Sequence, residues 1–186
     1  MLFRSGWVTS LRRQRVGWRL QLAGGGALEA EWVVLCAGLG NAALLEDRAL
    51  PEPLALEPVL GQAFELELDP ADSPADDLWP GAVQWRGMNL IARPSAGAAT
   101  WRLWLGATLE PGQHAAPEAL QALRTLGGEA PEWLLRARQR RVWQGLRARP
   151  VGQPAPLLRE LDDGLLLAGG HYRNGVLLAP ATAGWV

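Results

Sequence analysis

The segment of this sequence best suited to chemistry is a glycine-rich turn that begins at Gly169 and reads GGHYRNGVLLAPAT. The apolar run before it, 164–168, indicates a buried strand that ends at glycines, and we expect a helix to begin at Asn174. The first amides of a helix have no partner within it and carry partial positive charge, so they suit an anion or a ring carbonyl that gains negative charge on reduction. A purely structural turn is the alternative, and the pattern alone does not decide between the two.

A second glycine pair follows another apolar run. Residues 38–43, GLGNAA, fit the G-x-G-x-x-A turn that brings a dinucleotide pyrophosphate to a helix N-terminus. The expected helix, 41–50, is short because Pro51 stops it, and no strand ending in an acid follows about 20 residues later. A tight strand-to-helix turn that passes near a bound nucleotide is therefore the favoured interpretation. A stand-alone NAD-binding domain that uses Gly38 and Gly40 is the competing hypothesis.

Other reactive residue types are scarce. The single cysteine, Cys36, excludes an internal disulfide and a cysteine-based metal cluster, and we predict no metal site. His171 stands in the glycine-rich turn, where we expect it to shape the loop rather than act as a base, and His114 is expected on the surface. Arg147 lies in the arginine-rich stretch 136–149, for which a solvated surface is the ordinary interpretation.

The expected elements are of two kinds. The apolar run 32–37 suits a strand of a parallel sheet that is buried on both faces, and strands joined by tight turns precede it from residue 6. The middle of the chain is antiparallel in character, and its elements are strands at 57–68, 83–93, 101–109 and 141–149 with helices at 116–126 and 131–138. The pattern predicts a mixed α/β and α+β fold, in which part of a Rossmann-like nucleotide-binding domain encloses an antiparallel-sheet domain.

Length and charge narrow the class of protein. The chain has 186 residues and a formal net charge of −1, so nothing in its charge calls for nucleic acid or an anionic membrane. No run approaches the roughly 18 apolar residues that a spanning helix needs, and no signal peptide is recognisable, so we expect no membrane partner and a cytoplasmic location.

Five short stretches resemble the glycine oxidase branch of the D-amino-acid oxidase family of FAD-dependent oxidoreductases. The glycine-rich turn GGHYRNGVLLAPAT is similar to the segment that contacts the flavin in that family. The others are WVVLCAG at 32–38, PVLGQ at 58–62, LGATLE at 105–110 and WQGLR at 143–147. They occur in the family's order and span nearly the whole chain.

The resemblance implies a function and a site. FAD, bound non-covalently, would accept a hydride at its N5 from glycine, another small amino acid or an amine, and O₂ would reoxidise it, as in enzymes that serve thiamine biosynthesis. Arg147 would hold the substrate carboxylate through a bidentate pair, with Arg173 beside it. The implied cofactor-binding residues are Gly38, Gly170, His171, Arg173, Asn174, Gly175, Val176 and Leu177. Self-association into a homo-oligomer is left open.

The sequence departs from the family in two respects. Asn89 stands where the family often has a substrate-contacting tyrosine, which puts the substrate in doubt. The family's strand–GxGxxG–helix unit has no counterpart, so this polypeptide is expected to resemble a truncated C-terminal portion that does not hold the ADP half of FAD in the family's manner. Whether the chain is active alone is left open. The expected domains are 1–56 and 143–186 for FAD and 57–142 for substrate. The alternatives are a non-catalytic fragment that binds a partner and an amino-acid dehydrogenase that reduces a quinone.

Overall fold

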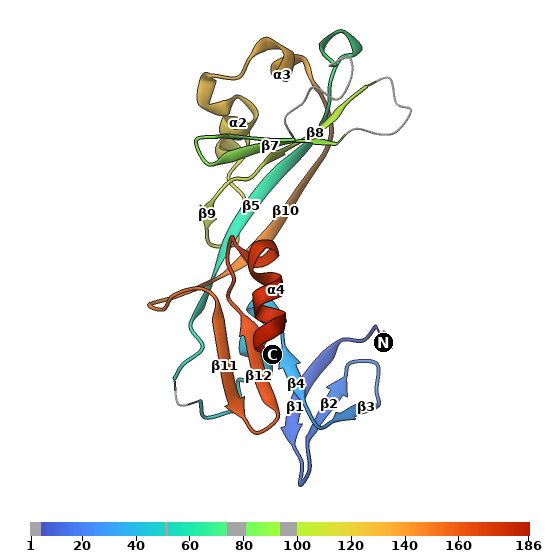
Figure 1. Cartoon of the computed structure of the whole chain (residues 1–186), viewed down its shortest axis with the longest axis vertical. Coiled ribbons are helices and arrows are strands. Elements are labelled where there is room, and N and C mark those ends of the chain that lie inside the picture. The colour runs from blue at the N-terminus through green and yellow to red at the C-terminus, as the bar shows by residue number, and fades with distance from the viewer. Residues whose placement is uncertain (1–4, 51, 74–80, 94–99) are drawn as a thin grey trace. The chain divides into compact units, whose positions relative to one another are not determined.

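The computed structural model describes residues 5–50, 52–73, 81–93 and 100–186, which form two compact units (Figure 1). Unit 1 comprises Met1–Glu57 and Arg147–Val186, and unit 2 comprises Pro58–Leu146. A mixed fold with a partly parallel sheet in one unit and an antiparallel sheet in the other is confirmed. The assignment of the expected domains to FAD and to substrate stays a prediction.

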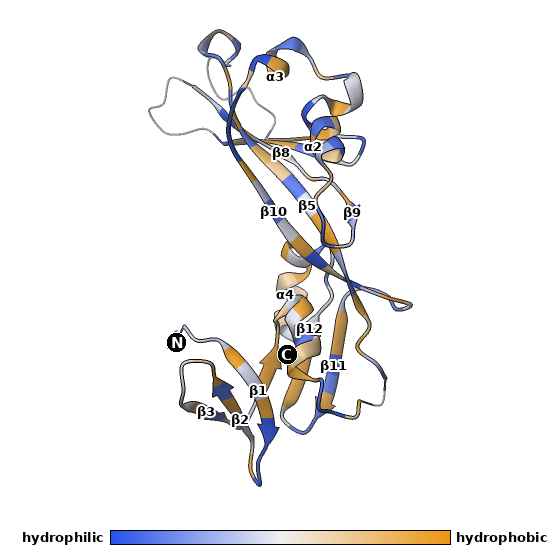
Figure 2. Cartoon of the chain, turned by 180° about the vertical axis from the view of Figure 1, so that it is seen from behind, coloured by the Kyte–Doolittle hydropathy of each residue, from blue (hydrophilic) through white to orange (hydrophobic). Residues whose placement is uncertain are grey.

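Unit 2 is built on one antiparallel sheet with the strand order β10-β5-β8-β7-β6, to which β9 adds beside β5. Its strands are β5 (Leu56–Glu67), β6 (Ala82–Trp85), β7 (Met88–Arg93), β8 (Arg102–Gly106), β9 (Glu110–Pro111) and β10 (Arg138–Pro150). Alternation along β5 buries Phe64, Leu66 and the following Leu68, as the sequence predicts. Leu103 and Leu105 of β8 complete this apolar face, which the hydropathy colouring shows as orange bands (Figure 2).

The strand predicted at 83–93 is in fact a hairpin. It divides into β6 and β7, which pair antiparallel around Arg86 and Gly87. Both turn residues have positive φ, 46° at Arg86 and 82° at Gly87. Two-residue turns with positive φ at both positions have a twist that matches that of the flanking strands. The predicted pairing of this segment with the next strand is confirmed, because β7 and β8 are antiparallel neighbours. The turn predicted at 95–98 lies outside the described residues.

Two short helices cover the apolar face of this sheet. Helix α2 (Pro117–Arg124) and helix α3 (Glu132–Arg136) lie within the two predicted helical segments and contribute Leu123 and Leu134 to the core. The guanidinium of Arg124 donates to three carbonyls at the end of α3, those of Leu134, Leu135 and Ala137. These bonds supply donors where the intrahelical ladder ends, and the Leu134 carbonyl also accepts from the amide of Ala137. Burial lowers the pKa of Arg124 from its ordinary value.

A buried polar cluster connects β5 to β9 and to the start of α2. The carboxylate of Glu110, 7% exposed, accepts hydrogen bonds from Gln62 Nε2 at 3.0 Å and from the Ala116 amide at 2.6 Å. The Thr108 hydroxyl donates to the same carboxylate and accepts from the Gln62 amide at 2.8 Å. Gln62 and Glu110 are the last residues of the stretches PVLGQ and LGATLE, so these motif positions are structural.

Unit 1 contains two three-stranded sheets. The first is the meander of β1 (Val8–Arg13), β2 (Trp18–Leu22) and β3 (Ala27–Ala30). The second has the order β11-β12-β4, with β11 (Leu157–Asp162) antiparallel to β12 (Leu165–Gly169) and β12 parallel to β4 (Val33–Leu35). One apolar cluster joins the two sheets. Its centre is Trp18, which is fully buried and donates from Nε1 to the carbonyl of Asp163 at 3.1 Å.

Two sequence expectations in unit 1 are wrong. The helix expected at 41–50 is only α1 (Asn41–Leu44), which follows the 3₁₀ turn η1 (Gly38–Gly40). The run at 32–37 is not buried on both faces, because Val33 and Leu35 are buried while Val34 is 38% exposed. The physical reason is that β4 is an edge strand in this sheet, with the meander covering one side only.

The last helix, α4 (Gly175–Trp185), begins where the sequence predicts and contains Pro180. It follows β12 after one turn of chain and lies against that strand in both views (Figures 1 and 2). Among the described helices, none has the length and apolar character required to cross a bilayer.

Candidate functional site

The candidate site lies at the carboxyl ends of the two parallel strands of unit 1. Strand β4 leads into the turn at Gly38, and β12 leads into the turn at Gly170, so both turns lie at the same edge of the sheet. Ligands of open α/β sheets bind at this edge. Both glycines have positive φ, 59° and 61°. No atom lies within 4 Å of a Cβ built on Gly38, so its backbone is open to close approach.

Gly170 is required by packing. A Cβ at this position would lie 2.9 Å from Cγ of Pro150 and 3.1 Å from Cγ of Leu157. The glycine therefore lets the chain turn sharply off the end of β12 and into the loop 171–174.

The N-terminus of α4 supplies the site's strongest electrostatic feature. The N-cap residue, Asn174, makes no side-chain cap, and its carbonyl accepts the first helical bond from Leu178 at 2.9 Å. The amides of Gly175, Val176 and Leu177 precede that bond, so they have no acceptor within the helix. Val176 is 95% exposed and Leu177 79%, which leaves this end of the helix open. It can accept an anion or a carbonyl oxygen that gains negative charge.

The loop between β12 and α4 is held in a defined shape. The amide of Asn174 donates to the carbonyl of His171 at 3.0 Å, and Tyr172 adopts a φ of 55°. His171 Nε2 lies 2.8 Å from the hydroxyl of Thr182 on α4. This bond engages one ring nitrogen in fixing the loop to the helix.

The two arginines predicted to bind substrate occupy different environments. Arg147 is half-buried on β10 and makes contacts within the chain, whereas Arg173 is exposed in the loop. Arg149 lies two residues beyond Arg147, on the same face of the strand. Its guanidinium pairs with Glu57 and lies 6.0 Å from the centroid of the Tyr172 ring. The end of β10 is therefore adjacent to the loop that carries Arg173.

Sequence reasoning missed Asn41, which joins the two glycine turns. Its side chain is fully buried, and Oδ1 accepts from the amide of Ala37 at 2.9 Å. Its Nδ2 lies 2.9 Å from the position that a Cβ on Gly169 would occupy, and it is the one buried side-chain atom without a partner in the described part of the chain. The signal was an asparagine directly after G-x-G, but only the folded chain shows that it reaches the other turn.

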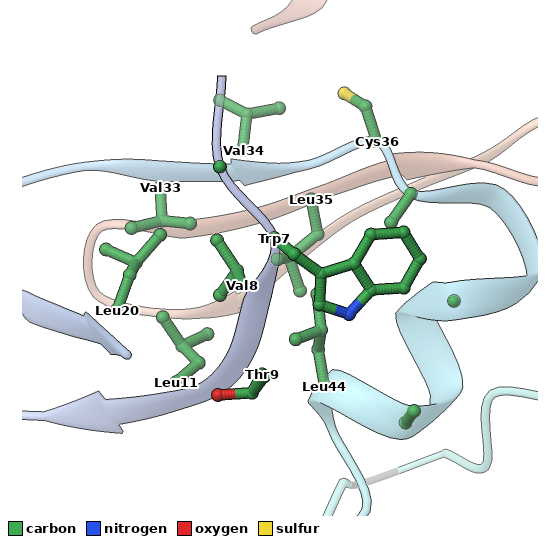
Figure 3. A pocket seen from close by; sticks show the side chains of 14 residues that line it. Trp7, Val8, Thr9, Leu11, Leu20, Val33, Val34, Leu35, Cys36 and Leu44 are labelled. Carbon is green, nitrogen blue, oxygen red and sulfur yellow. The ribbon is translucent and has the colours of Figure 1, made fainter. Parts of the chain in front are cut away.

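An apolar cavity of about 590 Å³ adjoins the first glycine turn. Its walls come from β1, from β4 and from the turn that ends at α1, and Trp7, Val33, Leu35 and Leu44 are among the lining residues (Figure 3). Cys36 borders it, and desolvation raises the pKa of this thiol. Such walls suit an uncharged ring rather than a phosphate.

These features fit one part of FAD. The open N-terminus of α4 fits the polar edge of a flavin ring. The pyrophosphate needs a glycine turn that opens a full helix, and α1 has four residues, too few to create a helix N-terminal site. His114, as expected, is exposed on the surface.

Curated relatives named glycine oxidase match most of this chain. Glycine oxidase of Pseudomonas putida is 35% identical over 161 residues, a match that covers 84% of this chain and 40% of the relative. Glycine oxidase of Pseudomonas aeruginosa is 33% identical over 161 residues, a match that covers 84% of this chain and 41% of the relative. The chain thus spans about 40% of the length of the curated relatives it matches.

Solved structures show the same fold. Glycine oxidase from Geobacillus kaustophilus superposes with a TM-score of 0.75 at 27% identity, over 98% of this chain and 47% of that one. Iminodiacetate oxidase from Chelativorans sp. BNC1 gives a TM-score of 0.77 at 21% identity, over 97% of this chain and 47% of that one, and at this identity the likeness concerns the fold alone. The model of the FAD dependent oxidoreductase (DAO) family matches residues 2–186. The chain therefore belongs to the FAD dependent oxidoreductase (DAO) family.

Proposed function

We propose that this chain forms the flavin-facing and substrate-facing portion of an oxidase that deaminates glycine or another small amino acid or amine. The observation that carries the proposal is the uncapped N-terminus of α4, which follows the glycine turn at the carboxyl end of a parallel strand. The family is FAD-dependent, and the relatives named glycine oxidase match most of this chain. Small amino acids and O₂ are the corresponding substrates.

The α4 amides would hold the ring. The N–H groups of Gly175, Val176 and Leu177 would donate to its polar edge, and the helix dipole would favour the negative charge that the ring acquires on reduction. When bound, FAD would take two electrons and a proton from the substrate Cα–H bond and pass electrons to O₂. The oxidised substrate is an imine, which water hydrolyses to an oxoacid and ammonia or an amine.

The arginines would orient the substrate. Arg147 would bind its carboxylate through two parallel N–H···O bonds, and Arg173 would add positive charge beside the loop. Holding the carboxylate fixes the direction of the Cα–H bond, which is the contribution that positioning makes to such a reaction. A His or Asp general base is unnecessary when the reacting amine is neutral.

The ring site can be tested with riboflavin, a probe that lacks the pyrophosphate. In Val176→Pro the second residue of α4 loses its N–H, and proline is tolerated in the first turn of a helix. Loss of one hydrogen bond of about 1 kcal/mol predicts roughly fivefold weaker binding, measured by quenching of flavin fluorescence. Val176→Ala keeps the N–H and is the matched control. Absence of riboflavin binding by the parent chain, or equal binding by both variants, would overturn the ring site.

The carboxylate site is tested by titrating the flavin-loaded chain with glycine and following the visible spectrum. Arg147→Lys keeps the charge and loses the planar pair of donors, so we expect glycine binding to weaken by about tenfold or more. Arg138→Lys, on the same strand but exposed beside Glu67, is the control. An unchanged glycine response in Arg147→Lys would remove Arg147 from the site.

A further inference from the structure

The end of β10 contacts the loop that leads into α4 at two points. The guanidinium carbon of Arg149 lies 6.0 Å from the centroid of the Tyr172 ring, within the range of a cation–π contact. One residue further along β10, Pro150 packs so closely on Gly170 that its Cγ would lie 2.9 Å from a Cβ on that glycine. All four residues belong to unit 1. Both charge and packing therefore hold the strand to the loop.

Glu57 orients the side chain of Arg149. One oxygen of its carboxylate accepts a hydrogen bond from Nε of Arg149 and forms an ion pair with Nη2 of the same guanidinium. Because the guanidinium is planar, engaging two of its nitrogens fixes the direction of the whole group. The side chains of Arg149 and Glu57 are 43% and 40% exposed, so the ion pair by itself adds little to stability. Its main consequence is to hold the guanidinium over the Tyr172 ring.

Tyr172 adopts a backbone conformation that needs support from its surroundings. Its φ of 55° lies in the left-handed region, which a bulky side chain rarely adopts and which persists where neighbouring contacts hold it. The residue before it is anchored to α4, because His171 Nε2 lies 2.8 Å from the Thr182 hydroxyl. Tyr172 itself is anchored to β10 through Arg149. The loop is thus attached to two different elements at successive residues.

We propose that Arg149 is a positioning residue that sets the separation of the two arginines expected to hold the substrate. Arg147 lies two residues before Arg149 on the same face of β10, and Arg173 directly follows Tyr172. The single contact between Arg149 and Tyr172 therefore links the backbone positions of both arginines. A carboxylate held from two fixed directions binds more weakly when that link is broken.

The contact can be measured without flavin, because Tyr172 is the chain's only tyrosine. Incorporation of fluorotyrosine therefore gives one fluorine resonance, which is sensitive to a guanidinium beside the ring. Arg149→Leu removes that guanidinium and should shift the resonance. Arg19→Leu is the matched control, because Arg19 is 50% exposed in a comparable ion pair, 3.2 Å from Glu29 on the meander. It should leave the resonance where it is.

The positioning role is measured by titrating the riboflavin-loaded chain with glycine and following the visible spectrum. Arg149→Leu and Tyr172→Leu should each weaken glycine binding by about fivefold, which corresponds to one contact of about 1 kcal/mol. Both variants leave the α4 amides in place, so riboflavin binding should weaken by less than about twofold. Because either substitution removes the same contact, the double variant should also lose about fivefold, not the roughly twenty-fivefold product of independent effects. Tyr172→Phe keeps the face of the ring and should bind glycine as the parent chain does.

Four results would overturn the proposal. They are a fluorine resonance that Arg149→Leu does not shift, unchanged glycine binding in that variant, a double variant that shows the product of the two effects, and riboflavin binding that weakens in parallel with glycine binding, which would indicate a loss of structure only. The inference rests on the proposed function, and the two can fail separately. A parent chain that does not respond to glycine would reject both. A parent chain that responds, with an equal response in Arg149→Leu, would reject the positioning role alone.

Discussion

Replacing Glu110 should destabilise unit 2 more than any substitution of an exposed carboxylate. Glu110→Ala removes the acceptor of three donors in a buried cluster: Gln62 Nε2, the Ala116 amide and the Thr108 hydroxyl. Gln62 is 4% exposed and Thr108 9%, so water cannot replace the carboxylate without opening the fold. An unsatisfied buried donor costs about 1–3 kcal/mol. Gln62 Nε2 keeps its bond to the Ala116 carbonyl, so the two remaining donors place the loss at about 2–6 kcal/mol.

Glu110→Gln removes the charge of the side chain but nearly keeps its shape. The amide keeps one oxygen and nearly the same volume, but charge-assisted bonds of about 1.5–3 kcal/mol become neutral bonds of about 0.5–1.5 kcal/mol. We expect it to lose about 1–3 kcal/mol, less than Glu110→Ala. Because domain stabilities are about 5–15 kcal/mol, the alanine variant should unfold at much lower urea concentration.

The effect should also depend on pH. Desolvation would raise the pKa of Glu110, but the hydrogen bonds from Thr108, Ala116 and Gln62 lower it below its ordinary value of 4.5. A carboxyl whose folded pKa is depressed contributes stability that is present above its unfolded pKa and is lost as pH falls through the folded pKa. The difference between the parent chain and Glu110→Ala should therefore be full at neutral pH and should shrink as the solution becomes more acidic than pH 4.5.

The assay is amide hydrogen exchange at β5 and β8, because it reports on unit 2 alone in a chain of two units. Glu118→Gln, an exposed carboxylate in the first turn of α2, is the control and should cost no more than about 1 kcal/mol. A loss below about 1 kcal/mol in Glu110→Ala, against the cost of its unsatisfied donors, would refute the reasoning. So would a difference from the parent chain that does not change with pH.

Three further substitutions test other parts of the fold. Gly164→Ala places a Cβ 2.4 Å from the carbonyl oxygen of Glu31 at a residue whose φ is +69°. The melting temperature, measured by calorimetry, should therefore fall sharply. Arg124→Ala removes the guanidinium bonds to three carbonyls at the end of α3, of which that of Leu134 keeps the Ala137 amide as a donor. It should cost about 1–3 kcal/mol in urea unfolding, and a loss below about 0.5 kcal/mol would contradict this expectation. His171→Ala removes the bond to Thr182, so hydrogen exchange should quicken in α4 by about fivefold and not in β5.

Local patterns in the sequence predicted most of the elements for identifiable reasons. Alternation along β5 and the apolar run of β12 each depend on nearest neighbours, and the burial of Phe64 and Leu66 confirms them. The sequence does not reveal the hairpin at Arg86 and Gly87, because the residues before and after this turn read as a single strand. Only the positive φ of these two successive residues divides that run into two strands.

The errors in unit 1 have a different origin. Burial of Val34 depends on whether a helix or strand lies over β4, which the composition of β4 does not report. The helix expected at 41–50 ends at Leu44 because tertiary packing overrides its propensity: Leu45 is buried with Leu35 and Trp18 instead. The position of Asn41 could not be predicted from sequence, since its side chain lies against Gly169, in a turn more than a hundred residues away.

The motif residues divide into two physical classes, and the division carries a consequence for mutagenesis. Gln62 and Glu110 satisfy each other inside unit 2, so their replacement should change stability while leaving the α4 amides intact. Asn174 stands at an open helix end and is exposed, so changes there should alter flavin binding with a smaller effect on unfolding. Measuring flavin binding and unfolding for one residue of each class therefore distinguishes a role in the site from a role in the core. A flavin-binding loss in Glu110→Gln at temperatures where unit 2 remains folded would contradict this division.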